Sequence, residues 1–390
     1  MAQKNDHNIY PCPLHKKCGG CQLQGLTYEE QLQYKMNKEI KLLGKLGHVN
    51  PIYGMENPTH YRNKVQAAFD YDYRHKKLIS GVYQSGSHRV VPVNDCLIED
   101  KIADKIMVDI RKLMQDFKFQ AYDEDSKRGF IRHVLIKRGF TTGEIMVVIV
   151  SGKPQFPSCR NFVNALLKIH PEITTIIHNI NPYQTNLVLG KQEKVLYGKG
   201  YIEDELLGCT FRISARSFYQ INPVQTEELY QTAIDYCDLT GRETFFDAYC
   251  GTGTIGLIAA TQGAAKVIGV ELNKDAVRDA ISNAKRNHIE NARFYAADAT
   301  RFIMEMAESG EKVDVIMMDP PRAGSTEAFL DACVKMGPPR IVYVSCNPET
   351  LARDLRYITK KGYKVTLIQP VDMFPYTDHV ETVVQLRKVN

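Results

Sequence analysis

Two side chains near the end of the chain could take part in covalent chemistry, a cysteine thiol and a carboxylate. Cys346 follows the apolar run RIVYVS, and Glu381 opens the apolar run ETVVQL. A thiolate is a strong nucleophile, and the N-terminus of a helix lowers the pKa of a nearby thiol. We expect a helix that begins near Glu349 to activate Cys346, and Glu381 could act as a base.

A glycine-rich turn indicates a nucleoside ligand. Asp247 lies near the end of the apolar run TFFDAY, and Gly251, Gly253 and Gly256 follow it in the pattern G-x-G-x-x-G. Such glycines let the backbone approach a ligand at the carboxyl end of a strand. Glu271, about 20 residues later, is suitably placed to accept hydrogen bonds from both hydroxyls of a ribose. The pattern alone also fits NAD.

Three acidic positions favour S-adenosylmethionine over NAD. Asp247 would repel a pyrophosphate but would attract a cationic amino-acid group, and Asp298, after the run RFYAA, could accept a hydrogen bond from an adenine amino group. Asp319 begins the rigid segment DPPR, which could hold an acceptor above a sheet. Ligands of open α/β sheets bind at this edge, so the three positions together predict a methyltransferase.

A thiol, a carboxylate and a methyl donor together predict methylation at C5 of uracil. C5 is a poor nucleophile until a thiolate adds at C6, and a base must then remove the C5 proton. Cys346 and Glu381 fit these two roles. Arg322 follows the double proline where enzymes that methylate exocyclic amines commonly have an aromatic residue. The cysteine that cytosine-C5 enzymes carry in this segment is absent as well.

A cysteine cluster near the start of the chain predicts a metal site. Cys12, Cys18 and Cys21 follow the spacing C-x5-C-x2-C, and Cys96 is a fourth candidate. Zinc and an iron–sulfur cluster both accept four thiolates, and the spacing does not separate them.

The periodic pattern predicts the elements that position these groups. Thr27 and Glu30 form a capping-box pair before apolar residues at helical spacing, which are Leu32, Met36, Ile40 and Leu43. Short β-like runs follow, and after them strands and helices alternate, with seven strand candidates. We predict a cysteine region with a helix at 1–60, a mostly β RNA-binding domain at 61–215 and a Rossmann-like α/β domain with a seven-stranded sheet at 216–390.

Composition agrees with an ordinary globular protein. The 390 residues include 50 Lys and Arg against 45 Asp and Glu, and this net charge of +5 permits a polyanionic partner. No run is long and apolar enough for a membrane span, and the polar start MAQKNDHNIY does not resemble a signal peptide, so we expect a cytoplasmic protein. We also expect a monomer. Basic residues in the β-rich part predict a surface for RNA phosphates. They are Arg62, Lys64, Arg89, Arg132 and Lys137.

The motifs resemble the family of RNA uracil-C5 methyltransferases, which act on 23S ribosomal RNA or on tRNA. The resemblance covers nearly the whole chain, through CPLHKKCGGCQLQ, SFYQINPVQ, FFDAYCGTGTIGL, GVELN, MMDPPRAG, YVSCNPETLARDL and MFPYTDHVETVVQL. It implies Cys346 as the nucleophile and Glu381 as the proton acceptor. It also implies a four-iron four-sulfur cluster on Cys12, Cys18, Cys21 and Cys96. Residues expected around the cofactor and the target base are Gln220, Tyr249, Gly251, Gly253, Thr254, Glu271, Asp298 and Asp319.

The resemblance favours 23S ribosomal RNA as the substrate and tRNA as the second choice, because members with a cluster mostly act on ribosomal RNA. Many relatives carry a small RNA-binding β-barrel before the cysteines, whereas only eleven residues precede Cys12 here. RNA affinity is therefore expected from the cysteine region and the β domain. Two alternatives are an iron–sulfur RNA-binding protein with a vestigial methyltransferase site and an NAD-linked oxidoreductase.

Overall fold

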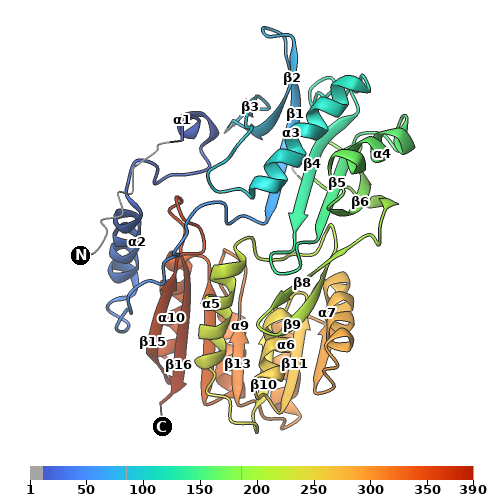
Figure 1. Ribbon diagram of the computed structural model, residues 1–390. Helices are drawn as coiled ribbons and strands as arrows, with labels where there is room; N and C mark the ends of the chain where they lie inside the picture. Colours follow the sequence, from blue (N-terminus) through green and yellow to red (C-terminus); the bar gives the residue numbers. More distant parts are fainter. Residues whose placement is uncertain (1–11, 85, 186, 390) are drawn as a thin grey trace, which may run out of the picture. The chain divides into compact units, whose positions relative to one another are not determined.

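The computed structural model describes residues 12–84, 86–185 and 187–389 (Figure 1). The start of the chain, in which we expect no secretion signal, lies outside the described residues. The chain forms two compact units. The N-terminal unit comprises residues 1–25, 58–205 and 212–223, and the C-terminal unit comprises residues 26–57, 206–211 and 224–390. The division at residues 60 and 215 stays a prediction. No helix in the described part is long and apolar enough to cross a membrane.

The N-terminal unit contains a seven-stranded sheet in the order β3-β2-β1-β4-β5-β6-β7. All neighbouring strands are antiparallel except β5 and β6, which are parallel. The strands are β1 (Lys64–Asp72), β2 (Lys77–Tyr83), β3 (Val90–Pro92), β4 (Ile131–Arg138), β5 (Ile145–Ser151), β6 (Ile173–Ile180) and β7 (Gln192–Tyr197).

Two helices, α3 (Lys101–Asp116) and α4 (Cys159–Ile169), pack their apolar sides against this sheet (Figure 1). Each residue of β5 is buried, as a strand with both faces covered requires. A short helix, α1 (His15–Cys18), lies between two of the N-terminal cysteines, and a two-stranded ladder joins β8 (Ile202–Leu206) to β9 (Cys209–Ile213).

The C-terminal unit contains the second seven-stranded sheet, in the order β12-β11-β10-β13-β14-β16-β15. The first five strands in this order are parallel, and β16 is antiparallel to both of its neighbours. Each of the seven runs predicted as strands is a strand here. The strands are β10 (Thr244–Ala248), β11 (Lys266–Glu271), β12 (Ala292–Ala296), β13 (Val315–Met318), β14 (Arg340–Ser345), β15 (Tyr363–Val371) and β16 (Glu381–Lys388).

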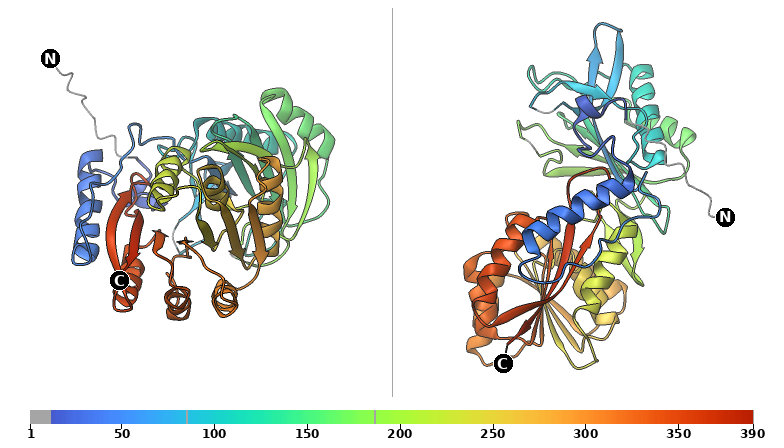
Figure 2. Two further views of the ribbon diagram at one scale, coloured as in Figure 1. Left: turned by 90° about the horizontal axis from the view of Figure 1, so that it is seen from below. Right: turned by 90° about the vertical axis from the view of Figure 1, so that its left-hand side faces the viewer.

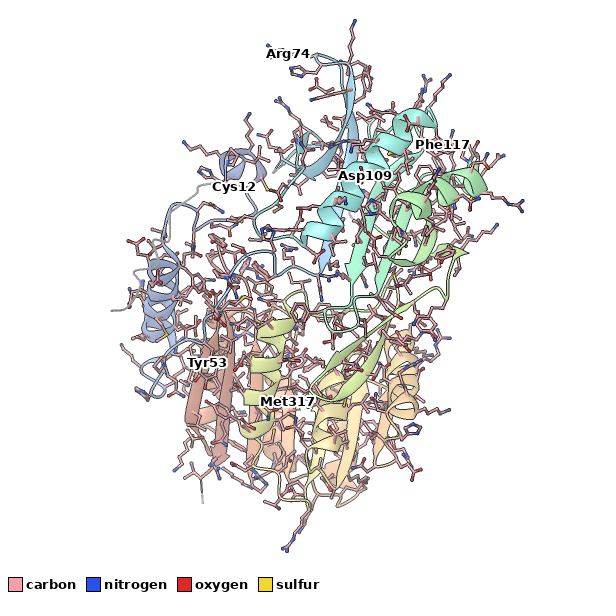
Figure 3. All side chains as sticks on the ribbon, viewed as in Figure 1. Cys12, Tyr53, Arg74, Asp109, Phe117 and Met317 are labelled. Carbon is pink, nitrogen blue, oxygen red and sulfur yellow. The ribbon has the colours of Figure 1, made fainter. Side chains whose placement is uncertain are left out.

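Helices cover both faces of this sheet, as the connections between parallel strands require (Figure 2). The four residues of the central strand β13 are all buried, and Met317, labelled in Figure 3, is fully enclosed. The alternation of strands and helices predicted from the sequence is confirmed. The helices are α5 (Pro223–Asp235), α6 (Thr254–Thr261), α7 (Lys274–Arg286), α8 (Ala299–Glu308), α9 (Glu327–Met336) and α10 (Pro348–Thr359).

Helix α2 (Tyr28–Leu43) groups with the C-terminal unit and packs against α10. In Figure 2 it lies beside the red strands β15 and β16. Its predicted capping box is present. The expected apolar face is present in part, because Leu43 is fully buried and Met36 packs against the core, whereas Ile40 is half exposed. The polar residues Gln31, Lys35 and Glu39 are fully buried as well. Hydrogen bonds to the C-terminal strands explain this burial, as described below.

Candidate active site

Five parallel strands of the C-terminal unit end at one edge of the sheet, and the predicted chemical groups lie there. Asp319 directly follows β13, and Cys346 directly follows β14. Glu381 is the first residue of β16, which runs the other way, so this strand begins where its neighbour β14 ends. The register pairs Ser345 with Thr382. Cys346 and Glu381 each lie one residue beyond this pair, so they are neighbours at the ends of two adjacent chain segments.

The glycine turn after β10 leaves its backbone open to a ligand. Gly251 has a left-handed φ of 54°, and a Cβ built on it would meet no atom within 4 Å. Gly253 has a φ of 79°, and a Cβ there would lie 2.9 Å from Ala280 and Phe294, so the fold excludes a side chain. Helix α6 begins at Thr254, directly after the turn.

Carboxylates at the ends of β10 and β11 hold this turn. The Gly251 N–H donates to Glu271 Oε2 at 3.2 Å, and the Gly256 N–H donates to Asp247 Oδ2 at 2.9 Å. A Cβ on Gly256 would lie 2.8 Å from that Asp247 oxygen, which explains the third glycine of the pattern. Tyr249, also left-handed with a φ of 62°, packs its ring against Phe329 at 5.3 Å between centroids.

Asp298 has a structural role in addition to any ligand contact. It is the N-cap of α8, and its Oδ1 accepts a hydrogen bond from the Arg301 N–H at 2.9 Å. Leu272, directly after Glu271, is 74% exposed at the neighbouring strand end. Sequence reasoning missed this apolar residue, which could cover one face of a flat ligand ring. The available signal was a leucine following the acidic residue that ends the strand.

The loop after β13 is tied to the loop that carries Cys346. Asn347 Nδ2 donates to the Arg322 carbonyl at 3.1 Å, and Asn347 Oδ1 caps α10 by accepting from the Glu349 N–H at 3.1 Å. Arg353, one turn further along α10, donates to the Ala323 carbonyl at 3.0 Å. These bonds fix Arg322 and Cys346 in one rigid arrangement.

The electrostatic surroundings of Cys346 differ from the sequence expectation. Burial, with smaller contributions from Glu381 and Asp319, raises the pKa of the Cys346 thiol to about 11, and the Arg322 guanidinium acts in the opposite direction. The expectation that the start of α10 lowers this pKa is therefore wrong. Loss of water around the sulfur outweighs the helix N-terminus, because a thiolate needs solvation or a close cation.

Three carboxyl groups at this edge are also withdrawn from solvent: Asp247 and Glu381 are buried, and Asp319 is partly buried. Burial raises the pKa of Asp319 to about 7, and it raises the pKa of Asp247 to about 8, with Asp319 and Glu271 adding to the shift. Burial and the Asp319 carboxylate raise the pKa of Glu381 well above its ordinary value. None of the three forms an ion pair within the described part of the chain. A cationic ligand would stabilise their ionised forms.

The polar face of α2 supports the segment that leads to Glu381. Lys35 Nζ lies 2.5 Å from Asp372 Oδ1 in a fully buried ion pair. The Tyr376 N–H donates to Gln31 Oε1 at 2.8 Å, and Thr382 Oγ1 donates to Glu39 Oε2 at 3.0 Å. Sequence reasoning missed these residues. Their only signal was a row of polar side chains at four-residue spacing.

Several other predicted residues lie in the N-terminal unit. Gln220 belongs to it, and the Gln220 carbonyl accepts from Asn63 Nδ2 at 3.2 Å. Its role beside the cofactor stays a prediction. Arg132 and Lys137 were expected to bind RNA phosphates, but they are only 2% and 7% exposed. The sequence alone does not distinguish a buried cation from a surface cation on a strand.

Both buried cations are used by the fold. Arg132 donates to both oxygens of Glu124 at 2.9 and 2.7 Å and to the Asn181 carbonyl at 2.6 Å. Lys137 Nζ donates to the carbonyls of Ser214 and Ser217, both at 2.8 Å. Neither cation is available to a phosphate, so this part of the expected RNA surface is wrong.

The four candidate metal ligands lie in the N-terminal unit. Within the described ranges, no group of three or more His, Cys, Asp or Glu side chains that could hold a metal ion is found. Burial raises the pKa of Cys96 to about 12 and also raises that of Cys21, whereas a metal ligand must be a thiolate. These shifts describe the metal-free thiols, and the iron–sulfur cluster stays a prediction from the cysteine spacing and from family resemblance.

Comparison with known proteins gives consistent matches. A family model described as tRNA (uracil-5-)-methyltransferase matches residues 27–389. An uncharacterized RNA methyltransferase of Halalkalibacterium halodurans is 43% identical over 97% of this chain and 83% of its own length. Another, from Clostridium acetobutylicum, is 42% identical over 100% of this chain and 86% of its own length.

One solved structure resembles most of the chain. It is the tRNA (uracil-54, C5)-methyltransferase of Pyrococcus abyssi in complex with S-adenosyl-L-homocysteine. The similarity has a TM-score of 0.79 at 27% sequence identity and covers 94% of this chain and 85% of that one. The seven-stranded sheet of the C-terminal unit, with its helices, therefore has the α/β methyltransferase fold.

Proposed function

Since the chain belongs to the tRNA (uracil-5-)-methyltransferase family, we propose that it transfers a methyl group from S-adenosylmethionine to C5 of a uridine in structured RNA. One observation carries the mechanism: Cys346 directly follows β14 and Glu381 begins the adjacent strand β16, at the strand edge that also holds the open glycine turn. The thiol and the carboxylate are the two groups that C5 methylation requires.

The residues present fit S-adenosylmethionine. The open backbone of Gly251 allows close approach, and the carboxyl groups of Asp247 and Asp319 suit a positively charged ligand. Glu271 and Asp298 each retain acceptor capacity for the ribose and the adenine. S-adenosylmethionine supplies, when bound, an electrophilic methyl group.

Cys346 begins the proposed reaction. Its thiol loses a proton to solvent, and Arg322 is the cation that favours the thiolate. The sulfur then forms a bond to C6 of uracil, and the electron pair of the C5–C6 double bond makes C5 nucleophilic enough to accept the methyl group. Glu381, as a carboxylate, removes the remaining C5 proton. The C5–C6 double bond forms again as the sulfur leaves, which regenerates the thiolate.

For the substrate, we propose uridine in 23S ribosomal RNA, by analogy with members of the family that carry the cysteine cluster. tRNA is the second candidate, because the similar Pyrococcus abyssi enzyme is named for uracil 54 of tRNA. The test is to map 5-methyluridine in 23S ribosomal RNA and in tRNA from cells with and without the gene. Complementation with Cys346→Ala is the matched control.

Loss of a 5-methyluridine from 23S ribosomal RNA alone, restored by the intact gene but not by Cys346→Ala, supports the proposal. Loss from tRNA alone would replace 23S ribosomal RNA by the second candidate. An unchanged content of 5-methyluridine in both RNAs contradicts uridine methylation by this chain.

The iron–sulfur cluster is a separate proposal that rests on sequence alone. Protein purified without oxygen should contain iron and sulfide and absorb broadly near 400 nm, as thiolate-bound clusters do. Cys96→Ser should lose the absorbance, whereas Cys159→Ser, which changes a cysteine of α4 outside the predicted ligand set, should retain it. A colourless wild-type protein without iron contradicts the cluster.

A further inference from the structure

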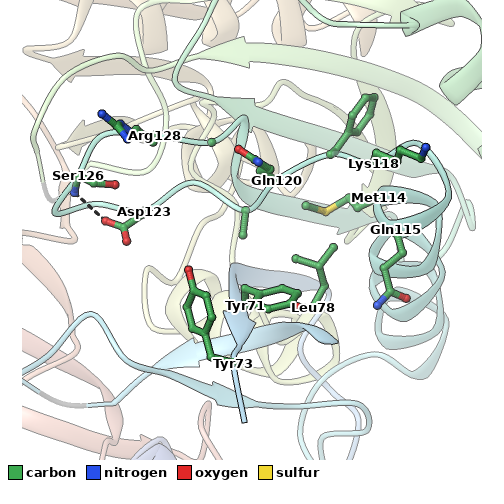
Figure 4. Close-up of a pocket in the computed structure, with 13 residues that line it drawn as sticks. Tyr71, Tyr73, Leu78, Met114, Gln115, Lys118, Gln120, Asp123, Ser126 and Arg128 are labelled. Atoms are coloured by element: carbon green, nitrogen blue, oxygen red, sulfur yellow. Dashed lines mark hydrogen bonds between the residues drawn. The ribbon is translucent and has the colours of Figure 1, made fainter. Parts of the chain in front are cut away.

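A cavity of about 560 Å³ opens on the N-terminal unit (Figure 4). It lies between the β1–β2 hairpin, the end of α3 and the segment 118–129. All of its lining residues belong to the N-terminal unit, and none takes part in the strand edge described above. Its volume is within the range of pockets that bind small molecules or parts of larger ones.

One side of this cavity presents aromatic rings to solvent. Tyr71 is 38% exposed and Tyr73 is 82% exposed, and their rings meet edge to face with centroids 5.0 Å apart. The inner surface is apolar, because Leu78, Met114 and Phe119 line it from the core. An exposed pair of tyrosines above an apolar floor is a suitable surface for stacking a flat ring.

The other side carries polar groups. Figure 4 shows Gln120, Asp123 and Ser126 across the cavity from Tyr73. Asp123 Oδ1 accepts hydrogen bonds from the backbone N–H groups of Asp125 and Ser126, at 2.9 and 2.7 Å, so this carboxylate mainly shapes the turn. Gln120 is exposed, and its amide can both donate to and accept from a ligand edge.

Two cations and one carboxylate line the cavity. Lys118 and Arg128 line it against the single carboxylate of Asp123. The β1–β2 turn beside the lining carries the exposed Arg74, labelled in Figure 3, and the exposed Lys76, together with Asp72, which pairs with His75. This surplus of positive charge favours a ligand that carries negative charges beside its ring, as a nucleotide in a nucleic-acid strand does.

We propose that this cavity binds one unpaired nucleobase of the RNA substrate, with the base against Tyr71 and Tyr73 and its flanking phosphates near Arg128 and Arg74. The proposal rests on the proposed function only in that the substrate is RNA. It supplies an RNA contact in the N-terminal unit to replace Arg132 and Lys137, which are buried. A paired base has no free face for the tyrosines, so the cavity selects RNA with an exposed base.

The test compares binding by full-length variants to two probes, an unmodified transcript of 23S ribosomal RNA and a fully paired RNA duplex. Tyr73→Ala should bind the transcript about tenfold more weakly, as expected when one stacked base loses its aromatic partner. Tyr73→Phe should bind like the wild type, because it keeps the ring. Duplex binding should be the same for all variants. Tyr197→Ala is the matched control, since this β7 tyrosine is 43% exposed and lies outside the cavity.

An equal loss for Tyr73→Ala on both probes, or an equal loss for Tyr197→Ala, would overturn the proposal. So would transcript binding by Tyr73→Ala at the wild-type level. Methyl transfer at saturating RNA is measured separately and should be nearly unchanged in Tyr73→Ala. A wild-type protein that binds the transcript but forms no 5-methyluridine in any RNA would overturn the proposed function and leave the binding comparison valid.

Discussion

Strand β4 of the N-terminal sheet and the strand edge of the C-terminal sheet bury charge in opposite ways. In the N-terminal unit the buried Arg132 has a bidentate carboxylate partner and two backbone carbonyl partners, and Lys137 has two carbonyl partners. At the strand edge of the C-terminal unit, Glu381 is buried and Asp319 is partly buried, and neither forms an ion pair within the described residues. Burial shifts the pKa values of these two groups upward.

This difference separates architecture from function. A buried charge whose partners are all supplied by the chain stabilises one arrangement of that chain. Buried carboxyl groups that lack a cationic partner carry an uncompensated desolvation cost, and they cluster where a ligand completes the set. This contrast supports our proposal that the strand edge of the C-terminal unit is a ligand site, whereas the basic strand β4 is part of the framework. The predictions below test each side of this contrast.

The largest effect is expected for the nucleophile. Cys346→Ala should lower methyl transfer by at least about 10⁴-fold, because no other group can add to C6 of uracil. Binding of S-adenosylmethionine, measured by calorimetry, should change little, since the thiol attacks the base. Cys159→Ala is the control and should retain full activity. Comparable turnover of Cys346→Ala and the wild type contradicts the role of Cys346.

Replacement of the proposed base, Glu381, should block a later step than replacement of Cys346. In Glu381→Gln the thiol can add and the methyl group can be transferred, but the C5 proton stays and the sulfur cannot leave. The expected result is a covalent protein–RNA adduct that survives denaturing electrophoresis. The double variant with Cys346→Ala is the control and should form no adduct. Normal product release by Glu381→Gln would assign the proton transfer to another group.

The structural role of the buried Arg132 is tested by measuring the stability of the fold. Arg132→Ala leaves Glu124 and two carbonyl groups without their donor, so it should lower the free energy of unfolding by about 3–5 kcal/mol. Thermal and denaturant unfolding measure this change. Arg89→Ala removes an exposed cation of the same unit and should change stability very little. Equal stabilities for the two variants would contradict the structural role of Arg132.

Sequence patterns predicted the C-terminal unit well, because parallel strands have near-continuous apolar runs and their ends must meet at one edge. Asp319, Cys346 and Glu381 could therefore be placed together without coordinates. The apolar pattern of α2 did not predict that its polar residues are buried, because an argument from helical periodicity assumes that the apolar residues are the buried ones. Gln31, Lys35 and Glu39 are buried through partners hundreds of residues later in the chain.

The pKa of Cys346 was predicted in the wrong direction for a related reason. A helix N-terminus is visible in the sequence, whereas the loss of water around a side chain depends on the packing of several elements. The basic residues of β4 illustrate the same limit. An alternating strand pattern shows that two faces exist, but it does not show which elements cover each face.

The smallest predicted effect concerns the pH dependence of ligand binding at the strand edge. Because the pKa of Asp319 is raised to about 7 and that of Asp247 to about 8, both groups are largely protonated at pH 6. A cationic ligand binds the ionised forms, so raising the pH from 6 to 7.5 should tighten S-adenosylmethionine binding by at least about eightfold. Calorimetric titration across this range measures the change. Asp319→Asn should flatten the dependence, since it removes the group that ionises most within the range. Arg132→Lys, which keeps a cation in the N-terminal sheet, should follow the wild-type curve.

An affinity independent of pH in the wild type would mean that the ligand's positive charge does not lie near these carboxylates, and the contrast between the two sheets would then need another cause.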